Sequence, residues 1–264
     1  MVTKEGEVCA KIVLAGDPQQ LEAVTKSKHA KNFGFSKSYF EHLTEMKPYQ
    51  PNPNYDPRFI TFLTKNYRSN KSILDVPNEL FYENRLVACA PPEITDLFIG
   101  SDILLSKECP IIIIPSQGTC EKLENKSSIN RDEIRKVRDI VNKLIGSKPP
   151  NAKEIIKASD IGIISPYLGQ CKELKRSFGW NIDLSIGTTE AFQGSEKPII
   201  IISTVKTNGV LGFLDDYRRF NVAITRAKSL LVLIADTQTL RKDRNWDRFI
   251  EYCEERGCIE TTNK

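Results

Sequence analysis

The sequence predicts an α/β fold in which a parallel sheet is covered by helices on both faces. Short apolar runs rich in isoleucine, leucine and valine, each bounded by Pro, Gly, Ser, Thr or Asp, predict the strands. Such runs stand at residues 111–114, 161–164, 199–202 and 230–234. They show no alternation of apolar and polar residues, which is typical of strands buried on both faces. Helical patterns lie between the runs, and this alternation of element types indicates an open parallel sheet.

Three segments predict helices by the spacing of their apolar residues. The clearest begins at Asn130, which with Glu133 has the spacing of a capping box. Its apolar residues share one face: Ile134, Val137, Val141 and Leu144. A second helix is predicted from about residue 166 to residue 174. A third is predicted over residues 246–253, with Gly257 closing it in the left-handed conformation.

Length and composition place the chain among soluble globular proteins. It has 264 residues, of which 40% are hydrophobic, 27% charged and 8% aromatic, and this excludes a disordered or collagen-like chain. The length fits one large domain, or one complete unit with part of another. The formal net charge of +4 is compatible with nucleic-acid binding but does not identify it.

Targeting and metal-binding signals are missing from the sequence. No stretch reaches the roughly 18 apolar residues of a membrane helix, and charged residues follow Met1 in place of an apolar signal core. The 7 cysteines are scattered, without a CxxC pair, and only 2 histidines accompany them. We therefore expect a cytosolic or nuclear protein with reduced thiols and no metal site of its own.

Polar segments follow several of the apolar runs. Residues 13–15 are followed by GDPQQL, residues 161–164 by SPY, and residues 185–186 by GTTEAFQGSE. In open α/β sheets, ligands bind at the carboxyl ends of the strands. The sequence therefore predicts a binding edge there.

Five sequence blocks occur in an order that resembles the later motifs of superfamily 1 helicases. They are GDPQQL at 16–21, NYRS at 66–69, IGIISPY at 161–167, GTTEAFQGSE at 187–196 and RFNVAITRAK at 219–228. The flanking segments at 55–57, 73–78 and 81–82 are similar to those of the Upf-like RNA helicases, in particular the Armitage and Mov-ten group. One departure from the family pattern, Asn70-Lys71, affects only the local turn.

The resemblance implies a fold and a domain division. It implies a RecA-like sheet of the P-loop NTPase type, with residues 1–66 as the incomplete tail end of a first lobe and residues 67–264 as the second lobe. The phosphate-binding GxxxxGK[ST] loop and the metal-binding DExx strand, which precede GDxxQL in this family, are absent from the sequence. We therefore expect a fragment or partial gene product that is inactive alone, with the Mg²⁺ ligands outside the chain.

The resemblance also implies roles for individual residues. Catalytic roles fall on the amide and guanidinium groups of Gln20, Arg68 and Arg226. ATP contacts fall on Tyr67 for the adenine, Gly194 for a phosphate and Glu196 for the ribose. Nucleic-acid contacts fall on the hydroxyl-bearing residues Ser165, Tyr167 and Thr188. An arginine suits catalysis of phosphoryl transfer because its fixed, planar charge binds phosphate oxygens in pairs.

The function implied is ATP-dependent remodelling of, and 5′-to-3′ translocation on, single-stranded RNA, with ATP and Mg²⁺ as cofactors. The partners implied are RNA, the missing amino-terminal lobe and Argonaute-type silencing proteins, in the cytoplasm and away from membranes. Two alternatives stay open: a non-enzymatic, helicase-derived RNA-binding adaptor, and a DNA helicase of the same superfamily. Taken singly, each block also fits an ordinary turn or an exposed helical face.

Overall fold

The computed structural model describes residues 12–22, 25–50, 55–124, 127–179 and 182–261. By its internal contacts the chain divides into two compact units, Met1–Phe62 and Leu63–Lys264, which we call unit 1 and unit 2 and describe separately. The assignment of residues 1–66 and 67–264 to two helicase lobes stays a prediction.

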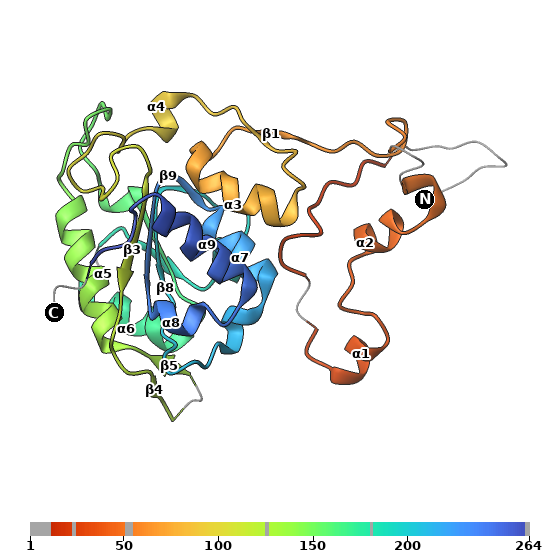
Figure 1. Cartoon of the computed structure of the whole chain (residues 1–264). Helices are drawn as coiled ribbons and strands as arrows, with labels where there is room; N and C mark the ends of the chain where they lie inside the picture. The colour runs from red at the N-terminus through yellow and green to blue at the C-terminus, as the bar shows by residue number, and fades with distance from the viewer. Residues whose placement is uncertain (1–11, 23–24, 51–54, 125–126, 180–181, 262–264) are drawn as a thin grey trace. The chain divides into compact units, whose positions relative to one another are not determined.

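A five-stranded parallel sheet forms the centre of unit 2 (Figure 1). Its strands, in spatial order, are β3 (Ile111–Pro115), β9 (Ala227–Ala235), β8 (Lys197–Ser203), β6 (Ile161–Ile164) and β7 (Ser185–Gly187). All neighbouring pairs in this sheet run parallel. Each of the four isoleucine- and leucine-rich runs lies in one of these strands, so the predicted α/β fold is confirmed.

Helices cover both faces of the sheet (Figure 1). One face packs against α3 (Lys71–Phe81), α7 (Tyr217–Ile224), α8 (Thr237–Leu240) and α9 (Arg244–Glu255). The other packs against α5 (Arg131–Leu144) and α6 (Leu168–Phe178). Successive residues of one strand enter opposite cores, as Ile201 and Ile202 do in β8. This double burial explains why the strands are apolar throughout.

Shorter elements complete unit 2. They are the parallel pair β1 (Lys65–Asn66) and β2 (Val87–Ala88), the antiparallel pair β4 (Glu121–Lys122) and β5 (Ser128–Ile129), helix α4 (Pro92–Thr95), and the 3₁₀ helices η2 (Ala158–Asp160), η3 (Glu190–Phe192) and η4 (Gly212–Asp215).

Helix α5 begins as predicted, but its capping box is only half formed. The Asn130 side chain accepts hydrogen bonds from the backbone N–H groups of Asp132 and Glu133 at 3.1 and 3.2 Å. Glu133 does not reach back to the Asn130 N–H, which donates to Gln170 instead, at 2.9 Å. The Glu133 side chain is fully buried and turns toward the end of β8, where Ser203 donates to it at 2.6 Å. Burial at the sheet therefore replaces the predicted return bond.

The two outer edges of the sheet are short or covered. Helix α9 ends before Gly257, which has φ +65° as predicted, and the chain then returns to β3. There Ile113 donates its N–H to the Cys258 carbonyl at 2.8 Å, and Glu260 donates to the Ile113 carbonyl at 2.9 Å. At the opposite edge, β7 is only three residues long.

Unit 1 contains α1 (Lys28–Asn32), α2 (Tyr39–Thr44) and the 3₁₀ helix η1 (Lys47–Tyr49). The apolar run 13–15, which had been placed among the strand candidates, is extended but forms no strand, and Val13 is 91% exposed. A strand needs a neighbour to accept its backbone hydrogen bonds, and the described part of this unit offers none.

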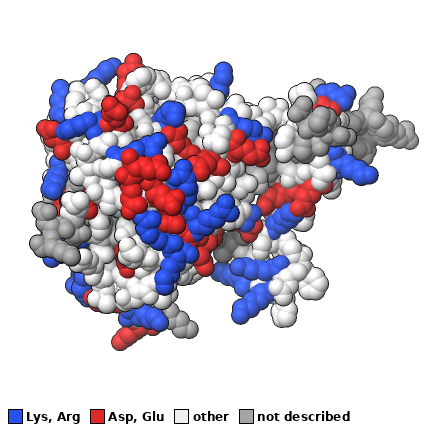
Figure 2. Space-filling model, in the orientation of Figure 1, with Lys and Arg blue, Asp and Glu red and all other residues white. Residues whose placement is uncertain are grey.

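Figure 2 shows acidic and basic side chains interleaved over the face of unit 2 that includes α3, α7 and α9. Many of them are paired; Arg248, for example, binds Glu79 at 2.8 Å. None of the described helices has the length and apolar character needed to cross a bilayer. The described cysteines are all free thiols, while Cys9 lies outside the described residues.

Candidate functional site

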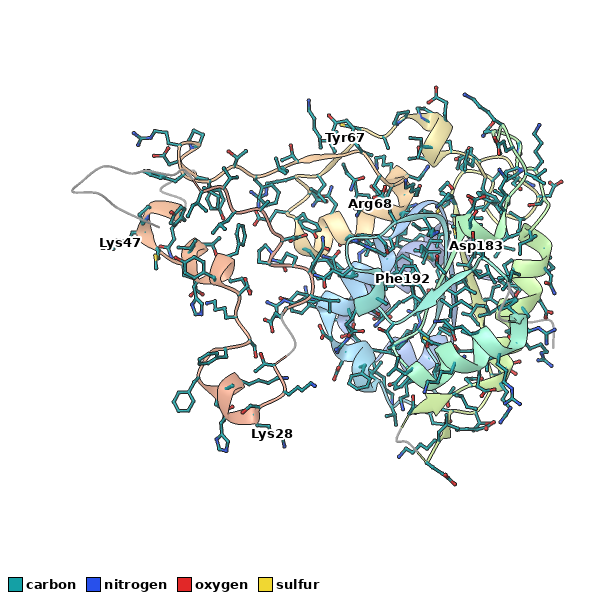
Figure 3. The ribbon with its side chains drawn as sticks, turned by 180° about the vertical axis from the view of Figure 1, so that it is seen from behind. Lys28, Lys47, Tyr67, Arg68, Asp183 and Phe192 are labelled. Atoms are coloured by element: carbon teal, nitrogen blue, oxygen red, sulfur yellow. The ribbon has the colours of Figure 1, made fainter. Side chains whose placement is uncertain are left out.

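Arg68 is fixed beside the start of β9 by the turn that precedes α3 (Figure 3). The Asn66 side chain accepts from the backbone N–H groups of Arg68 and Ser69, both at 3.0 Å. The Ser69 hydroxyl donates to the Ala227 carbonyl at 2.7 Å, and the Asn70 N–H donates to the Lys228 carbonyl at 2.8 Å. The side chain of Asn70 also caps α3 by accepting from the Ser72 N–H, so the departure from the family pattern leaves a well-formed turn.

The guanidinium of Arg68 lies in an ion-pair cluster with Glu196 and Lys228. Arg68 Nε donates to one carboxylate oxygen of Glu196, and Lys228 Nζ lies 2.9 Å from the other. Partial burial opposes ionisation of Glu196, but the hydrogen bonds from Lys228 and Arg68 outweigh it and lower the pKa of this carboxyl. Arg68 Nη1 donates weakly to the Thr225 carbonyl at 3.4 Å. Its Nη2 has no hydrogen-bond partner among the described residues.

Arg226 lies in the same region but is only 1% exposed. Its Nε donates to the Val222 carbonyl at 3.0 Å and its Nη2 to the Thr225 hydroxyl at 2.9 Å. Its Nη1 donates to the Ser195 carbonyl at 3.4 Å. Arg226 therefore joins the end of α7 to the turn that contains Gly194 and Glu196. The two arginines converge on Thr225 and on this turn.

Gly194 forms the turn because of its backbone conformation. Its φ is +79°, and a Cβ built on it would meet no atom within 4 Å. The space is open, so the left-handed conformation, and not crowding, favours glycine here. Ser195 continues the turn by donating from its backbone N–H and its hydroxyl to the Phe192 carbonyl, both at 3.0 Å.

Tyr67 and Gln20 are the two other residues predicted for the nucleotide site. Tyr67 is 65% exposed, with its ring available to a ligand. Gln20 belongs to unit 1, where its side-chain amide donates to Asp17 at 2.8 Å. Their proposed roles toward ATP stay predictions.

The three residues predicted to contact nucleic acid lie toward the other end of the sheet. Ser165 and Tyr167 follow the carboxyl end of β6, and Thr188 follows that of β7. The arginine cluster instead lies where β8 and β9 begin. Ser165 is fully buried and Tyr167 is 6% exposed, whereas Thr188 is half-buried. In this structure, then, solvent reaches Thr188 more readily than the other two.

Some residues of these regions had no role in the sequence interpretation. The block 219–228 contains Thr225 and Lys228, and their closeness to Arg226 in the sequence was the only sign that they belong to the site. For Glu133, the sequence indicated only a place in the first turn of a helix, three residues after Asn130. In the structure, its carboxylate accepts from Ser203 and from the Val205 N–H at 2.9 Å, and burial raises its pKa to about 8.

The donor set around Arg68 does not suit a metal ion. Glu196 already has two cationic partners, and the described residues contain no group of His, Cys, Asp and Glu arranged to bind a metal. The arrangement suits an anion better, because the side chain of Arg68 is 28% exposed and its Nη2 has no partner in the described part of the chain.

Comparison with known proteins identifies relatives along most of the chain. The model of an AAA domain family matches residues 35–238. The chain is 38% identical to "Putative helicase mov-10-B.2" of Danio rerio, over 93% of the chain and 26% of that protein. It is 36% identical to "RNA helicase Mov10l1" of Homo sapiens, over 93% of the chain and 22% of that protein. It is 32% identical to "Probable RNA helicase armi" of Drosophila melanogaster, over 96% of the chain and 23% of that protein.

The chain thus spans about a quarter of the length of these curated relatives. Their similarity covers nearly all of the chain, and the family model spans the four sequence blocks from residue 66 to residue 228. The chain belongs to the AAA domain family and, within it, to the superfamily 1 helicases of the Mov-ten and Armitage group.

Proposed function

We propose that residues 1–264 belong to an ATP-dependent RNA helicase and supply the second-lobe half of its nucleotide site. The observation that supports this most directly is the convergence of Arg68, Arg226 and Glu196 on one turn at the amino ends of β8 and β9. These residues come from three separate sequence blocks. Their meeting beside an open, glycine-containing turn is the arrangement that a phosphate-binding site needs.

The proposed role of Arg68 follows from its bonding. Its Nη2 arm is unused among the described residues, while its Nε is held by Glu196. Bound ATP, with Mg²⁺ held by residues outside this chain, presents a terminal phosphate whose charge spreads over several oxygens during transfer. Arg68 would bind these oxygens through Nη2 and orient them. Glu196 would fix the guanidinium, and Lys228 would keep Glu196 ionised.

Arg226 has a different task in this proposal. Its guanidinium is buried, and its bonds to Val222, Thr225 and Ser195 hold the 194–196 turn against the end of α7. A ligand-induced shift of this turn would move Ser195 and loosen the weakest of these bonds, at 3.4 Å. Arg226 would then be released toward the phosphate, as the family resemblance implies.

RNA is proposed to lie at the opposite end of the same sheet. Thr188 and the backbone near Ser165 and Tyr167 stand at the carboxyl ends of β6 and β7, next to the start of α6. A rigid parallel sheet between the two regions would transmit a lobe movement from nucleotide to RNA and produce 5′-to-3′ steps. Contacts of this kind read the sugar–phosphate backbone, so binding should tolerate many sequences and weaken with salt.

A second candidate is a non-enzymatic RNA-binding adaptor. The observation that favours it is the burial of Arg226 and the saturation of Glu196 by two cations, because a purely structural cluster would look the same. A DNA helicase is the third, since hydroxyl and backbone contacts scarcely distinguish ribose from deoxyribose. The resemblance favours RNA, the cytoplasm and Argonaute-type silencing partners, and these remain part of the proposal.

The test compares Arg68→Ala with Arg248→Ala in a longer protein that contains this chain and the P-loop lobe. Arg248 is a matched control because it is also a partly exposed arginine paired with a glutamate. The R68A variant should lose RNA-stimulated ATP hydrolysis by on the order of 10³-fold, with RNA affinity unchanged, while R248A stays active. Full activity of R68A would refute the enzymatic role and favour the adaptor.

Residues 1–264 alone should not hydrolyse ATP, because the sequence has no GxxxxGK[ST] loop to hold the triphosphate. Release of phosphate by the purified chain in the presence of RNA would contradict this. Competition between RNA and DNA strands of equal length would decide between the two nucleic acids.

A further inference from the structure

The ring of Phe213 stands half exposed at the end of the sheet where RNA is proposed to bind. It belongs to η4, in the segment that leaves the carboxyl end of β8, and is 52% exposed. Pro166, Thr189 and Phe213 line one small cavity. Phe213 therefore adjoins the residues next to Tyr167 and Thr188, although it is absent from the predicted site.

Two neighbouring side chains fix the orientation of the Phe213 ring. The ring of Tyr167 lies 5.7 Å from it, centroid to centroid, and the guanidinium carbon of Arg219 lies 5.1 Å from its centroid. Arg219 is itself held by Glu190 at 2.8 Å and Asp216 at 3.0 Å. A half-exposed ring that its neighbours already hold loses little conformational freedom when a second flat group stacks on it.

Tyr167 is covered by the same segment. It is only 6% exposed, and a Cβ placed on Gly212 would lie 2.7 Å from its hydroxyl oxygen. Glycine at 212, with φ +61°, therefore allows η4 to lie directly against Tyr167. The aromatic surface that solvent reaches at this place is Phe213 and not Tyr167.

Lys206 lies against the ring of Tyr167. Lys206 is 8% exposed, and its ammonium is 4.8 Å from the Tyr167 ring centroid. Its hydrogen-bond partners are the Ser128 hydroxyl at 3.4 Å and the Cys120 thiol at 3.7 Å. Among the described residues, no carboxylate lies within ion-pair distance of it. A buried cation without a counter-ion favours an anion nearby, because its charge is poorly screened.

We propose that Phe213 is a base-stacking residue for single-stranded nucleic acid, and that Lys206 attracts the adjoining backbone phosphate. This inference rests on the proposed function, which it deepens by naming a contact surface. An exposed flat ring beside an uncompensated cation matches a nucleotide, which offers a flat base and an anion together. A purely apolar partner would gain nothing from Lys206.

The experiment measures binding of residues 1–264 to two fluorescein-labelled 12-mers by anisotropy. One is oligouridylate, and the other is an abasic strand with the same sugar–phosphate backbone. Phe213→Ala should weaken oligouridylate binding by about 5- to 150-fold, which is the range for loss of one stacked base. It should leave binding of the abasic strand unchanged. Phe213→Trp should preserve binding and show quenching of the added tryptophan fluorescence.

Val210→Ala is the matched control, since Val210 lies in the same segment and is 58% exposed. It should change neither affinity by more than about 2-fold, because no ring is lost. If F213A loses the same affinity for both strands, or loses none for either, the stacking inference is overturned while RNA binding by the chain still stands. If the wild-type chain binds neither strand, the proposed function is overturned as well, and a protein partner becomes the better explanation of the exposed ring.

A second measurement covers the case in which F213A fails to fold. Photo-crosslinking of the wild-type chain to a strand with 5-iodouridine, followed by mass spectrometry, should label the peptide that contains Phe213. Labels confined to other peptides would refute the inference.

Discussion

Replacing Glu133 by glutamine should remove a large pH dependence from the stability of unit 2. Glu133 belongs to α5 and is completely buried against the end of β8. Burial raises the pKa of this carboxyl from 4.5 to about 8, against the hydrogen bonds from Ser203 and the Val205 N–H. Asp132 adds to the rise and Lys136 opposes it. The folded chain therefore keeps a proton that the unfolded chain releases above its ordinary pKa.

The sign and size of the effect follow from proton linkage. Because the folded state binds the proton more tightly, the contribution of Glu133 to stability is fully present below pH 4.5 and is lost as the pH rises to about 8. Each pH unit in that interval removes about 1.4 kcal/mol from the free energy of unfolding. The whole interval removes about 5 kcal/mol, an upper figure because buried groups relax on ionisation.

Urea unfolding at several pH values between 5 and 9, followed by circular dichroism, measures this. The wild-type midpoint should fall from pH 5 to about pH 8 and level off above it, whereas the E133Q midpoint should stay nearly level throughout. Glu121→Gln is the control, because Glu121 is an exposed glutamate on β4. Its midpoint should fall with pH in the same way as that of the wild type. If E133Q follows the same slope as the wild type, Glu133 is not the group that titrates.

Two further predictions concern the turn beside Arg68. Gly194→Ala should lower the free energy of unfolding by about 1 kcal/mol, because alanine is strained in the left-handed conformation, and it should also reduce ATP hydrolysis in the longer protein. The control is Gly179→Ala, at a position with φ +82° and equally open space, which should lower stability alone. Equal ATP hydrolysis by the two variants would argue against a role for the turn. Lys228→Ala should raise the pKa of Glu196, because one of its two cationic partners is lost. Carbon-13 NMR titration of the glutamate carboxyls measures this, and an unchanged Glu196 pKa would mean that Arg68 alone keeps it ionised.

The sheet could be predicted from the sequence because its strands are apolar for a simple reason. Ile199 to Ile202 enter two cores in alternation, so no polar residue interrupts the run. The extent of α5 was equally predictable, since Val137, Val141 and Leu144 form one buried stripe. Residues 13–15 have similar composition, but no described strand pairs with them, and pairing is not visible in a local pattern.

The candidate site could be predicted only as a set of residues. Sequence blocks suggested Arg68, Arg226 and Glu196, but not that Glu196 binds both Arg68 and Lys228. The burial of Arg226 against the 194–196 turn was also unforeseen, because the Ser195 carbonyl that it binds lies 31 residues away in the sequence. Long-range backbone contacts of this type have no signature in residue order.

The covered edge of β3 bears on the solubility of the protein. An uncovered outer strand offers a row of backbone donors and acceptors to any other extended chain, and so promotes aggregation. Here the segment after Gly257 occupies that row at Ile113, where two backbone bonds form. Proline at position 260 would remove one of these donors, and the edge would then be open to self-association between copies of the chain.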